Sequence, residues 1–421
     1  MSLFAVVMIL ILAVIIMSIS TRVTLSLNRG ADSYSERQAY WNAHSAVSVW
    51  ESGQQFPATT TYNSVNGWDT GEIIIDSTGM KGIGKTGSDS NIVWIVELDE
   101  REEQGGGADL GTEYTFTNCE QEGRTGPTQE QVDATYNVEN NTLNDAVMII
   151  TPGIQEWTVV HTGTYSIEAY GAQGGPADYY NPAGQLRESF VGGLGARMRG
   201  DFSLTQGDVI KIVVGQMGKT TTDEAAGGGG GGTFIVKSPY NSNSSILVIA
   251  GGGGGVGKAY FHTGLNGQPG LTGTTGGDPN PVNGGGLGGI NGNGASCPSN
   301  GCYAIGGGGG GGFFTAGYDC TSRKSKGGSA FTSNPTGGEG SFSNSPDVVL
   351  GVGGYGGGGG GSTQCGYGGG GGGYSGGGGG GWRSGCGGSG GGGGSYNAGT
   401  NQENTAGANS GHGFVIITVM E

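Results

Sequence analysis

The sequence predicts an α+β protein in which a long N-terminal α-helix carries a β-rich head. We expect the head to combine a β-sandwich with an inserted bundle of polyglycine II helices. The first observation behind this fold class is an apolar run over residues 3–17. The second is a set of short β-branched runs bounded by turn residues. The third is glycine, which accounts for 100 of the 421 residues and gathers in uninterrupted runs toward the C-terminus.

The N-terminal segment has the pattern of a helix that changes character halfway along. No glycine or proline occurs before Gly30, so nothing local stops a helix there. Apolar residues then recur along one helical face, at Ala39, Ala43, Ala46, Val47 and Trp50. Gly53 provides a C-terminal stop. We therefore predict a helix over residues 2–52, about 75 Å long, within an N-terminal domain of residues 1–54.

This segment resembles the type IV pilin family and its pseudopilin relatives, whose lollipop-shaped subunits place an apolar half-helix in the membrane and later in a filament core. The chain starts Met1-Ser2-Leu3-Phe4, with no basic residue before the apolar run, as a mature pilin does. It departs from the family at Ala5, where most mature pilins carry an acidic residue; in the family this absence is typical of tip or minor subunits. The resemblance implies that residues 1–25 form the membrane and filament core, with Leu3, Phe4, Val7, Leu10, Ile11, Val14 and Ile15 inside it.

Two other kinds of N-terminal segment also contain an apolar run. A secretory signal peptide normally has a basic region first, which is missing here, and Ser18-Ile19-Ser20 is only a passable cleavage site. A plain membrane anchor normally has about 20 apolar residues, and this run is shorter and merges into an amphipathic helix. Both alternatives stay open beside the favoured pilin-like helix.

Residues 55–112 are predicted to form a small β unit and an acidic linker. Strands are expected over residues 72–76 and 91–97. Between them, Gly79 to Thr86 satisfies the P-loop pattern, but a P-loop requires a helix directly after it. Because another strand follows, we interpret the turn after Thr86 as a hairpin tip and not as a nucleotide site.

Residues 113–421 form the third predicted domain, which contains an ordered series of motifs. They include Thr115-Phe116-Thr117-Asn118-Cys119, Ala169-Tyr170-Gly171-Ala172-Gln173-Gly174-Gly175, Leu247-Val248-Ile249-Ala250 before glycines 251–255, and Tyr367 before glycines 368–373. Through these motifs the domain is similar to the extracellular glycine-rich domain of the anaplastic lymphoma kinase and leukocyte tyrosine kinase receptors. The chain has no kinase signature, and the receptors' cytokine-binding residues cannot be placed on it. The resemblance puts the family's second cysteine at Val132, so it implies that the disulfide from Cys119 is lost.

The glycine runs themselves allow two interpretations. Glycine is entropically costly to order, which favours a flexible linker. However, strand-like sequence is interleaved with the runs, at residues 165–170, 208–214, 233–236, 245–249 and 413–419. Glycine can also form an extended helix of three residues per turn whose N–H and C=O groups point outward to partners. We favour such a lattice. Its predicted central positions are Gly229, Gly253, Gly309, Gly358, Gly370, Gly378 and Gly392.

The six cysteines all follow the apolar segment and would meet an oxidising exterior, where disulfides persist. The turn-rich spacing of Cys297 and Cys302 predicts a disulfide that closes a short loop. Six cysteines allow 15 connectivities, so Cys119, Cys320, Cys365 and Cys386 are left unassigned.

Little in the sequence indicates catalysis. The four histidines (His44, His161, His262 and His412) form no metal-binding spacing, and no nucleophile elbow is flanked by a strand and a helix. We therefore predict no enzyme, no cofactor and no metal site, although calcium binding is neither supported nor excluded. The net charge of −16, with 18 basic residues, argues against a nucleic-acid partner.

The leading function hypothesis is a structural subunit of an extracellular type IV-pilus-like filament, with apolar helices as its core and glycine-rich heads as its outer surface. It would be membrane-anchored before assembly. Its expected partners are copies of itself in a homo-oligomeric helical filament, the inner-membrane pilus assembly machinery, the membrane, and a surface or host ligand. The alternatives are a minor or tip pilin acting as an adhesin, and a membrane-anchored surface binding protein that does not polymerise.

Overall fold

The computed structural model describes residues 59–63, 69–76, 79–86, 110–180, 185–219, 226–257, 265–280, 284–297, 306–320, 325–341, 351–362, 366–383 and 386–420. The chain divides into two compact units, Met1–Gly106 and Gly107–Glu421. The division falls a few residues before the boundary expected between residues 112 and 113.

The first unit contains a three-stranded antiparallel sheet in the order β1-β2-β3, with β1 at Thr59–Asn63, β2 at Asp69–Asp76 and β3 at Gly79–Thr86. The segment that matches the P-loop pattern is strand β3, and it pairs with β2 along its whole length. A backbone that is paired in a sheet in this way is not the loop that a phosphate site needs. The strand predicted over residues 91–97 lies outside the described residues.

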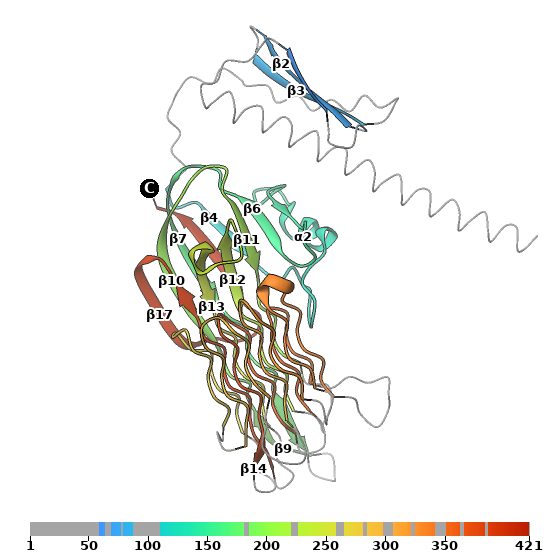
Figure 1. The fold of residues 1–421 in the computed structure, drawn as a ribbon, viewed down its shortest axis with the longest axis vertical. Coiled ribbons are helices and arrows are strands. Elements are labelled where there is room, and N and C mark those ends of the chain that lie inside the picture. Colours follow the sequence, from blue (N-terminus) through green and yellow to red (C-terminus); the bar gives the residue numbers. More distant parts are fainter. Residues whose placement is uncertain are drawn as a thin grey trace, which may run out of the picture. The chain divides into compact units, whose positions relative to one another are not determined.

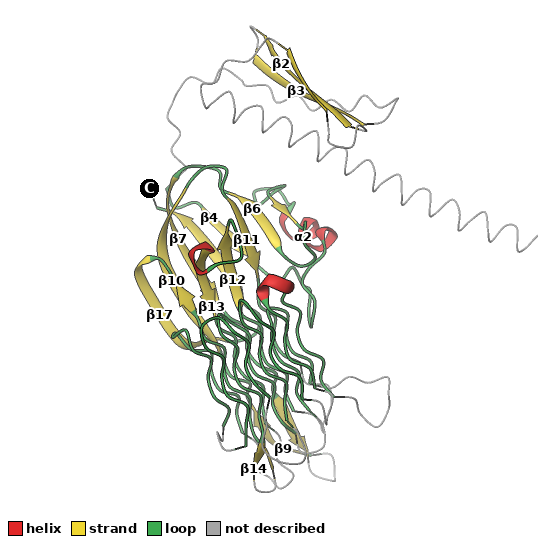
Figure 2. Ribbon diagram, in the orientation of Figure 1, coloured by secondary structure: helices red, strands yellow, loops and turns green. Residues whose placement is uncertain are grey.

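The second unit is built on two antiparallel sheets (Figures 1 and 2). The five-stranded sheet has the order β17-β10-β7-β18-β4, with bounds Thr400–Asn409, Gly195–Leu204, Gly163–Tyr170, Phe414–Val419 and Glu113–Phe116. The six-stranded sheet has the order β16-β13-β12-β11-β6-β5, with bounds Tyr396–Asn397, Ile246–Ala250, Thr233–Lys237, Val209–Val213, Gln155–Thr158 and Val147–Met148.

The inner faces of the two sheets enclose the main hydrophobic core. Trp157 on β6 and Tyr165 on β7 are completely buried, and their rings meet edge to face with centroids 6.2 Å apart. A short helix, α2 at Gln129–Tyr136, adds Val132 and Tyr136 to the same core. Thr128 caps the helix and forms a capping box with Gln131.

Strands β12 and β13 of the six-stranded sheet are buried on both faces, so their burial does not alternate as it does in β6. All five residues of β13 are buried. On the outer face, Phe234 and its neighbours contact a second cluster that includes Phe313 and Phe331 from the glycine-rich segments. The rings of Phe234 and Phe331 stack with centroids 5.3 Å apart. The glycine-rich part of the chain is thus attached to the sandwich through aromatic side chains.

The glycine-rich segments run side by side away from the sandwich, toward two short hairpins (Figure 1). The hairpins are β8–β9, at Ala177–Tyr180 and Leu186–Phe190, and β14–β15, at Trp382–Arg383 and Cys386–Gly387. We call these segments together the glycine lattice. It consists of residues 171–176, 191–195, 215–219, 226–232, 251–257, 265–271, 275–280, 284–297, 306–320, 325–329, 336–341, 351–362, 366–381 and 388–394. Turns at residues 291–292, 313–315, 355–357 and 373–375 divide the four longest of these ranges into two segments each. Two 3₁₀ turns, Asn243–Ser245 and Phe331–Ser333, lie in the connections.

The predicted α+β class is wrong, because the described residues are mostly strands and extended segments and their single α-helix is the two-turn α2. Within this described part, no helix is both long and apolar enough to cross a membrane. The α+β prediction depended on the long helix over residues 2–52. That segment, with Leu3, Phe4, Val7, Leu10, Ile11, Val14 and Ile15, lies outside the described residues, and nothing in the structure supports it.

The predicted pairing of Cys297 with Cys302 is also wrong, since Cys297 forms a disulfide with Cys320. The two cysteines end neighbouring lattice segments, which are joined by a 2.9 Å hydrogen bond from the N–H of Tyr318 to the carbonyl of Ala295. Their Cα atoms lie 5.6 Å apart, within the range that a disulfide requires. Lattice neighbours therefore determine the pairing, and short sequence spacing does not.

Candidate functional site: the glycine lattice

The central run of the lattice, residues 368–373, shows how the segments hold one another. Its N–H groups donate to three neighbouring segments in turn, and residues three positions apart donate to the same neighbour. The bonds are Gly368 to Gly388 and Gly371 to Gly391, Gly369 to Gly227 and Gly372 to Gly230, and Gly370 to Gly308 and Gly373 to Gly311, all between 2.9 and 3.2 Å. This period of three is that of a polyglycine II helix.

The carbonyl groups of the same run accept from three further segments. Gly255 donates to Gly369 and Gly252 to Gly372. Gly380 donates to Gly368 and Gly377 to Gly371, and Gly359 donates to Gly370. The run therefore has a hydrogen-bonded neighbour on each of six sides. This arrangement satisfies the outward-pointing backbone groups of a helix that has no internal hydrogen bonds.

Space, and not backbone torsion, requires glycine in this run. None of residues 368–373 has a φ in the left-handed region, so an L-residue could adopt the backbone conformation. A Cβ built on any of them would lie less than 3.0 Å from a backbone atom of a neighbouring segment. The side chain is excluded because the backbones are in direct contact.

The structure places all seven glycines that the sequence singled out within the lattice, and all are buried. A Cβ on each would overlap a carbonyl oxygen of a different segment. The pairs are Gly229 with Gly370, Gly253 with Gly193, Gly309 with Ala295, Gly358 with Gly229, Gly370 with Gly377, Gly378 with Gly286, and Gly392 with Pro269.

Two surface segments of the lattice carry a side chain at every third position, which was not predicted from the sequence. In residues 284–290 the side chains of Leu287 and Ile290 are 61% and 56% exposed, whereas Gly288 and Gly289 between them face other backbones. Val191 and Leu194 repeat the spacing on another segment. A helix of three residues per turn that lacks one neighbour has one free side. The signal in the sequence of these two segments is therefore Gly-Gly-X, against unbroken glycine for interior ones.

A small charged cluster ties the lattice to the turn between β17 and β18. The Lys219 ammonium donates to the Glu122 carboxylate at 2.6 Å, and Nε2 of His412 lies 3.6 Å from the same carboxylate. The other ring nitrogen of His412, Nδ1, accepts a 3.1 Å hydrogen bond from the backbone N–H of Met217. Burial lowers the pKa of His412, as does Lys219, while Glu122 opposes the shift.

This cluster predicts a pH dependence of stability. Because the pKa of His412 in the folded state is below its ordinary value of 6.5, the unfolded chain takes up a proton first as the pH falls. The contribution of His412 to stability should be constant above pH 6.5 and should decrease below it, because protonation of Nδ1 breaks the hydrogen bond from Met217. Thermal unfolding of the His412→Gln variant should lack this decrease. The same change at the exposed His161 should leave the decrease unaltered, and a decrease that persists in His412→Gln would contradict the assignment.

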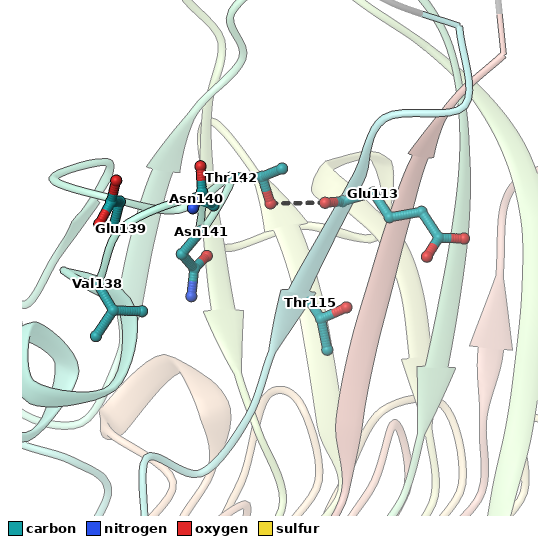
Figure 3. A pocket seen from close by; sticks show the side chains of 7 residues that line it. All are labelled: Glu113, Thr115, Val138, Glu139, Asn140, Asn141 and Thr142. Carbon is teal, nitrogen blue, oxygen red and sulfur yellow. Dashed lines mark hydrogen bonds between the residues drawn. The ribbon is translucent and has the colours of Figure 1, made fainter.

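The described part of the unit also contains a shallow polar hollow of about 390 Å³ beside the edge strand β4 (Figure 3). It is lined by Glu113, Thr115, Val138, Glu139, Asn140, Asn141 and Thr142. The hydroxyl of Thr142 donates to the carbonyl of Glu113 at 2.6 Å, which fixes the loop against the strand. Among the described residues there is no group of His, Cys, Asp or Glu side chains that could hold a metal ion. The hollow offers hydrogen-bonding groups but no nucleophile beside a base.

The fold and the lattice define a β-sandwich domain with inserted polyglycine helices. Comparisons with known proteins agree with the resemblance of this domain to the glycine-rich domain of the kinase receptors. No protein-family model matches the chain. The leukocyte tyrosine kinase receptor of Mus musculus is 34% identical over 112 residues, which is 26% of this chain and 12% of the receptor. The chain therefore covers only a small part of that relative. This match supports the resemblance to the kinase-receptor domain and gives no support to the pilin resemblance. Together with the disulfide, it indicates an extracellular or surface protein.

Proposed function

We propose that residues 110–420 are a rigid, non-catalytic domain of a surface protein, in which the glycine lattice holds surface side chains at fixed positions for contact with a partner. The observation that supports this proposal most directly is the hydrogen bonding of residues 368–373, which repeats every three residues and attaches one helix to six others. A flexible linker would leave these groups to water and would not fix any side chain in place.

Rigidity follows from the number of lateral bonds. Ordering each residue costs about 1–2 kcal/mol of conformational entropy, and glycine loses the most. Each lateral hydrogen bond returns on the order of 1 kcal/mol, and close backbone contact adds dispersion. The lattice is therefore stable only as a cooperative whole, because an isolated segment would have the entropy cost without the bonds.

An extracellular location supports this proposal. The disulfide between Cys297 and Cys320 joins two lattice segments, and disulfides persist outside the cytosol. The relative with which the chain shares a quarter of its length is named as a receptor. We propose contact with a partner as the use of the surface segments, since their side chains are the variable part of an otherwise uniform lattice.

Hydrogen exchange of the full chain, followed by mass spectrometry, tests the rigid lattice. We expect slow exchange in peptides from residues 366–381 and 226–232, comparable with β12 and β13, since lattice amides open only when the domain opens. Protease treatment of intact cells that produce the protein tests its location, because surface-exposed chains should be cleaved while the cells stay whole. Immediate exchange across residues 366–381 would reject the proposal, as would full protection of the chain on intact cells.

Filament assembly through residues 1–25 stays a prediction of the sequence alone, because those residues lie outside the described part of the chain. The pilus machinery and the membrane likewise remain partners predicted from the sequence alone. The domain of residues 110–420, which we call the lattice domain, fits a surface binding protein whether or not the chain polymerises.

A further inference from the structure

We propose that one face of the glycine lattice is a docking surface for a second copy of this chain, lattice against lattice, about a two-fold axis. We call it the grid face, formed by residues 275–280, 284–290, 293–297, 315–320 and 325–329. This inference rests on the rigid lattice of the proposed function and adds the partner, a second copy of the chain.

Hydrogen bonds between the surface segments arrange their side chains in two rows. Asn293 donates its N–H to the carbonyl of Ile290 at 3.1 Å, and Ser296 donates to that of Leu287 at 3.0 Å, so these residues lie opposite one another on adjacent segments. The first row continues to Thr275 and Thr315, and the second to Asp278 and Tyr318. On the last segment, Lys326 bonds to Asp319, which adjoins Tyr318. Since the rows are three residues apart on each segment, they are separated by about 9.3 Å.

The grid face exposes three large apolar side chains on the two sides of its central segment. Leu287, Ile290 and Tyr318 are 61%, 56% and 67% exposed, and they come from segments separated only by residues 293–297. Only glycines lie between Leu287 and Ile290, and the small polar residues Asn293 and Ser296 of the central segment lie between that pair and Tyr318. Large apolar side chains that are exposed close together are typical of an interaction site.

Charge favours a second copy as the occupant. With a net charge of −16, two copies repel each other, and they can meet only where a face is neutral or self-complementary. The grid face has Asp278 near one side and Lys326 near the other, with Asp319 already bonded to Lys326 at 2.7 Å. Its central segment, residues 293–297, carries no charged side chain.

A two-fold axis along residues 293–297 makes the face complementary to itself. In this pairing Asp278 of one copy lies opposite Lys326 of the other, and Leu287 lies opposite Tyr318. Asn293 lies opposite its own counterpart, where each amide can donate to and accept from the other. A closed two-fold interface has this property of bringing residue i to j and j to i.

A cysteine on the axis gives a direct test in the full chain. Asn293→Cys should cross-link to itself under mild oxidation, giving a disulfide-linked dimer on a non-reducing gel. Val191→Cys provides the matched control, because Val191 is 48% exposed on a lattice segment outside the grid face. Equal cross-linking of both variants would show association elsewhere in the chain and would overturn the proposal, as would no cross-linking of Asn293→Cys.

Charge reversal distinguishes this interface from other modes of dimerisation. In the Asn293→Cys background, Asp278→Lys alone and Lys326→Asp alone should each lower the dimer yield at least tenfold, because each places like charges opposite each other twice. An equal mixture of the two variants should restore the yield, since every Lys then faces an Asp in the mixed dimer. Restoration also shows that both variants fold. Failure of the mixture to recover would reject the two-fold arrangement, whereas slow hydrogen exchange in the lattice would still support the proposed function.

Discussion

Gly370→Val should lower the free energy of unfolding of the lattice domain by more than about 4 kcal/mol, which is exceptional for a single substitution. Gly370 lies in the central run, and a Cβ there would overlap the carbonyl oxygen of Gly377 and approach the backbone nitrogen of Gly310 at 2.8 Å. Neither group can move alone, because Gly310 donates to Gly377 at 2.9 Å and Gly377 donates to Gly371 at 2.8 Å. Relief of the overlap would therefore break several lateral bonds at once.

Gly273→Val is the matched control. No atom lies within 4 Å of a Cβ built on Gly273, its φ is outside the left-handed region, and the residue is exposed between two lattice segments. Its replacement should change stability by no more than about 0.5 kcal/mol. Urea unfolding followed by circular dichroism would measure both variants, and Gly370→Ala would show whether one methyl group already has most of the effect. Equal stability of the Gly370 and Gly273 variants would mean that the run is a linker.

Local strand signals in the sequence predicted much of the sandwich. Runs over residues 165–170, 208–214, 233–236, 245–249 and 413–419 correspond to β7, β11, β12, β13 and β18, because β-branched residues fit a buried pleated surface. Strands β10 and β17 were missed. Arg197, Arg199 and Asp201 interrupt the apolar pattern of β10, and β17 is mostly polar with no β-branched apolar residue, so tertiary pairing overrides propensity in both.

Helix α2 was also missed, although its capping box was visible. Thr128 followed three residues later by Gln131 is the expected start signal. The helix is only two turns long and its apolar face consists of Val132 and Tyr136, so periodicity alone could not reveal it.

Identical residues limit what a sequence can say about the lattice. Unbroken glycine identified the interior segments, but a glycine contains nothing that selects one neighbour over another. The hydrogen bond from Gly369 to Gly227 joins residues that are far apart in the sequence, and no local feature of either residue predicts it. Specificity comes instead from the non-glycine residues at the segment ends, such as Phe313 and Tyr374, which pack against the six-stranded sheet and set the register.

The disulfide is one of these register-setting contacts, and it should contribute about 3 kcal/mol to stability. Cys297 and Cys320 are separated by 23 positions, and a cross-link over a loop of that length restricts the unfolded chain by about this amount. Cys320→Ser should therefore lower the free energy of unfolding of the lattice domain by roughly 3 kcal/mol.

Two measurements separate this pairing from the one expected from spacing. Mass mapping of a non-reduced digest should show the peptide with Cys297 joined to the peptide with Cys320, and a link from Cys297 to Cys302 would contradict the structure. The double variant Cys297→Ser/Cys320→Ser should be no less stable than either single variant, because both changes remove the same bond. Independent, additive losses would mean that the two cysteines have different partners. If the pairing holds, the cross-link fastens residues 293–297 to residues 315–320, the central and the tyrosine-bearing segments of the grid face, so loss of the disulfide should also reduce cross-linking through Asn293→Cys.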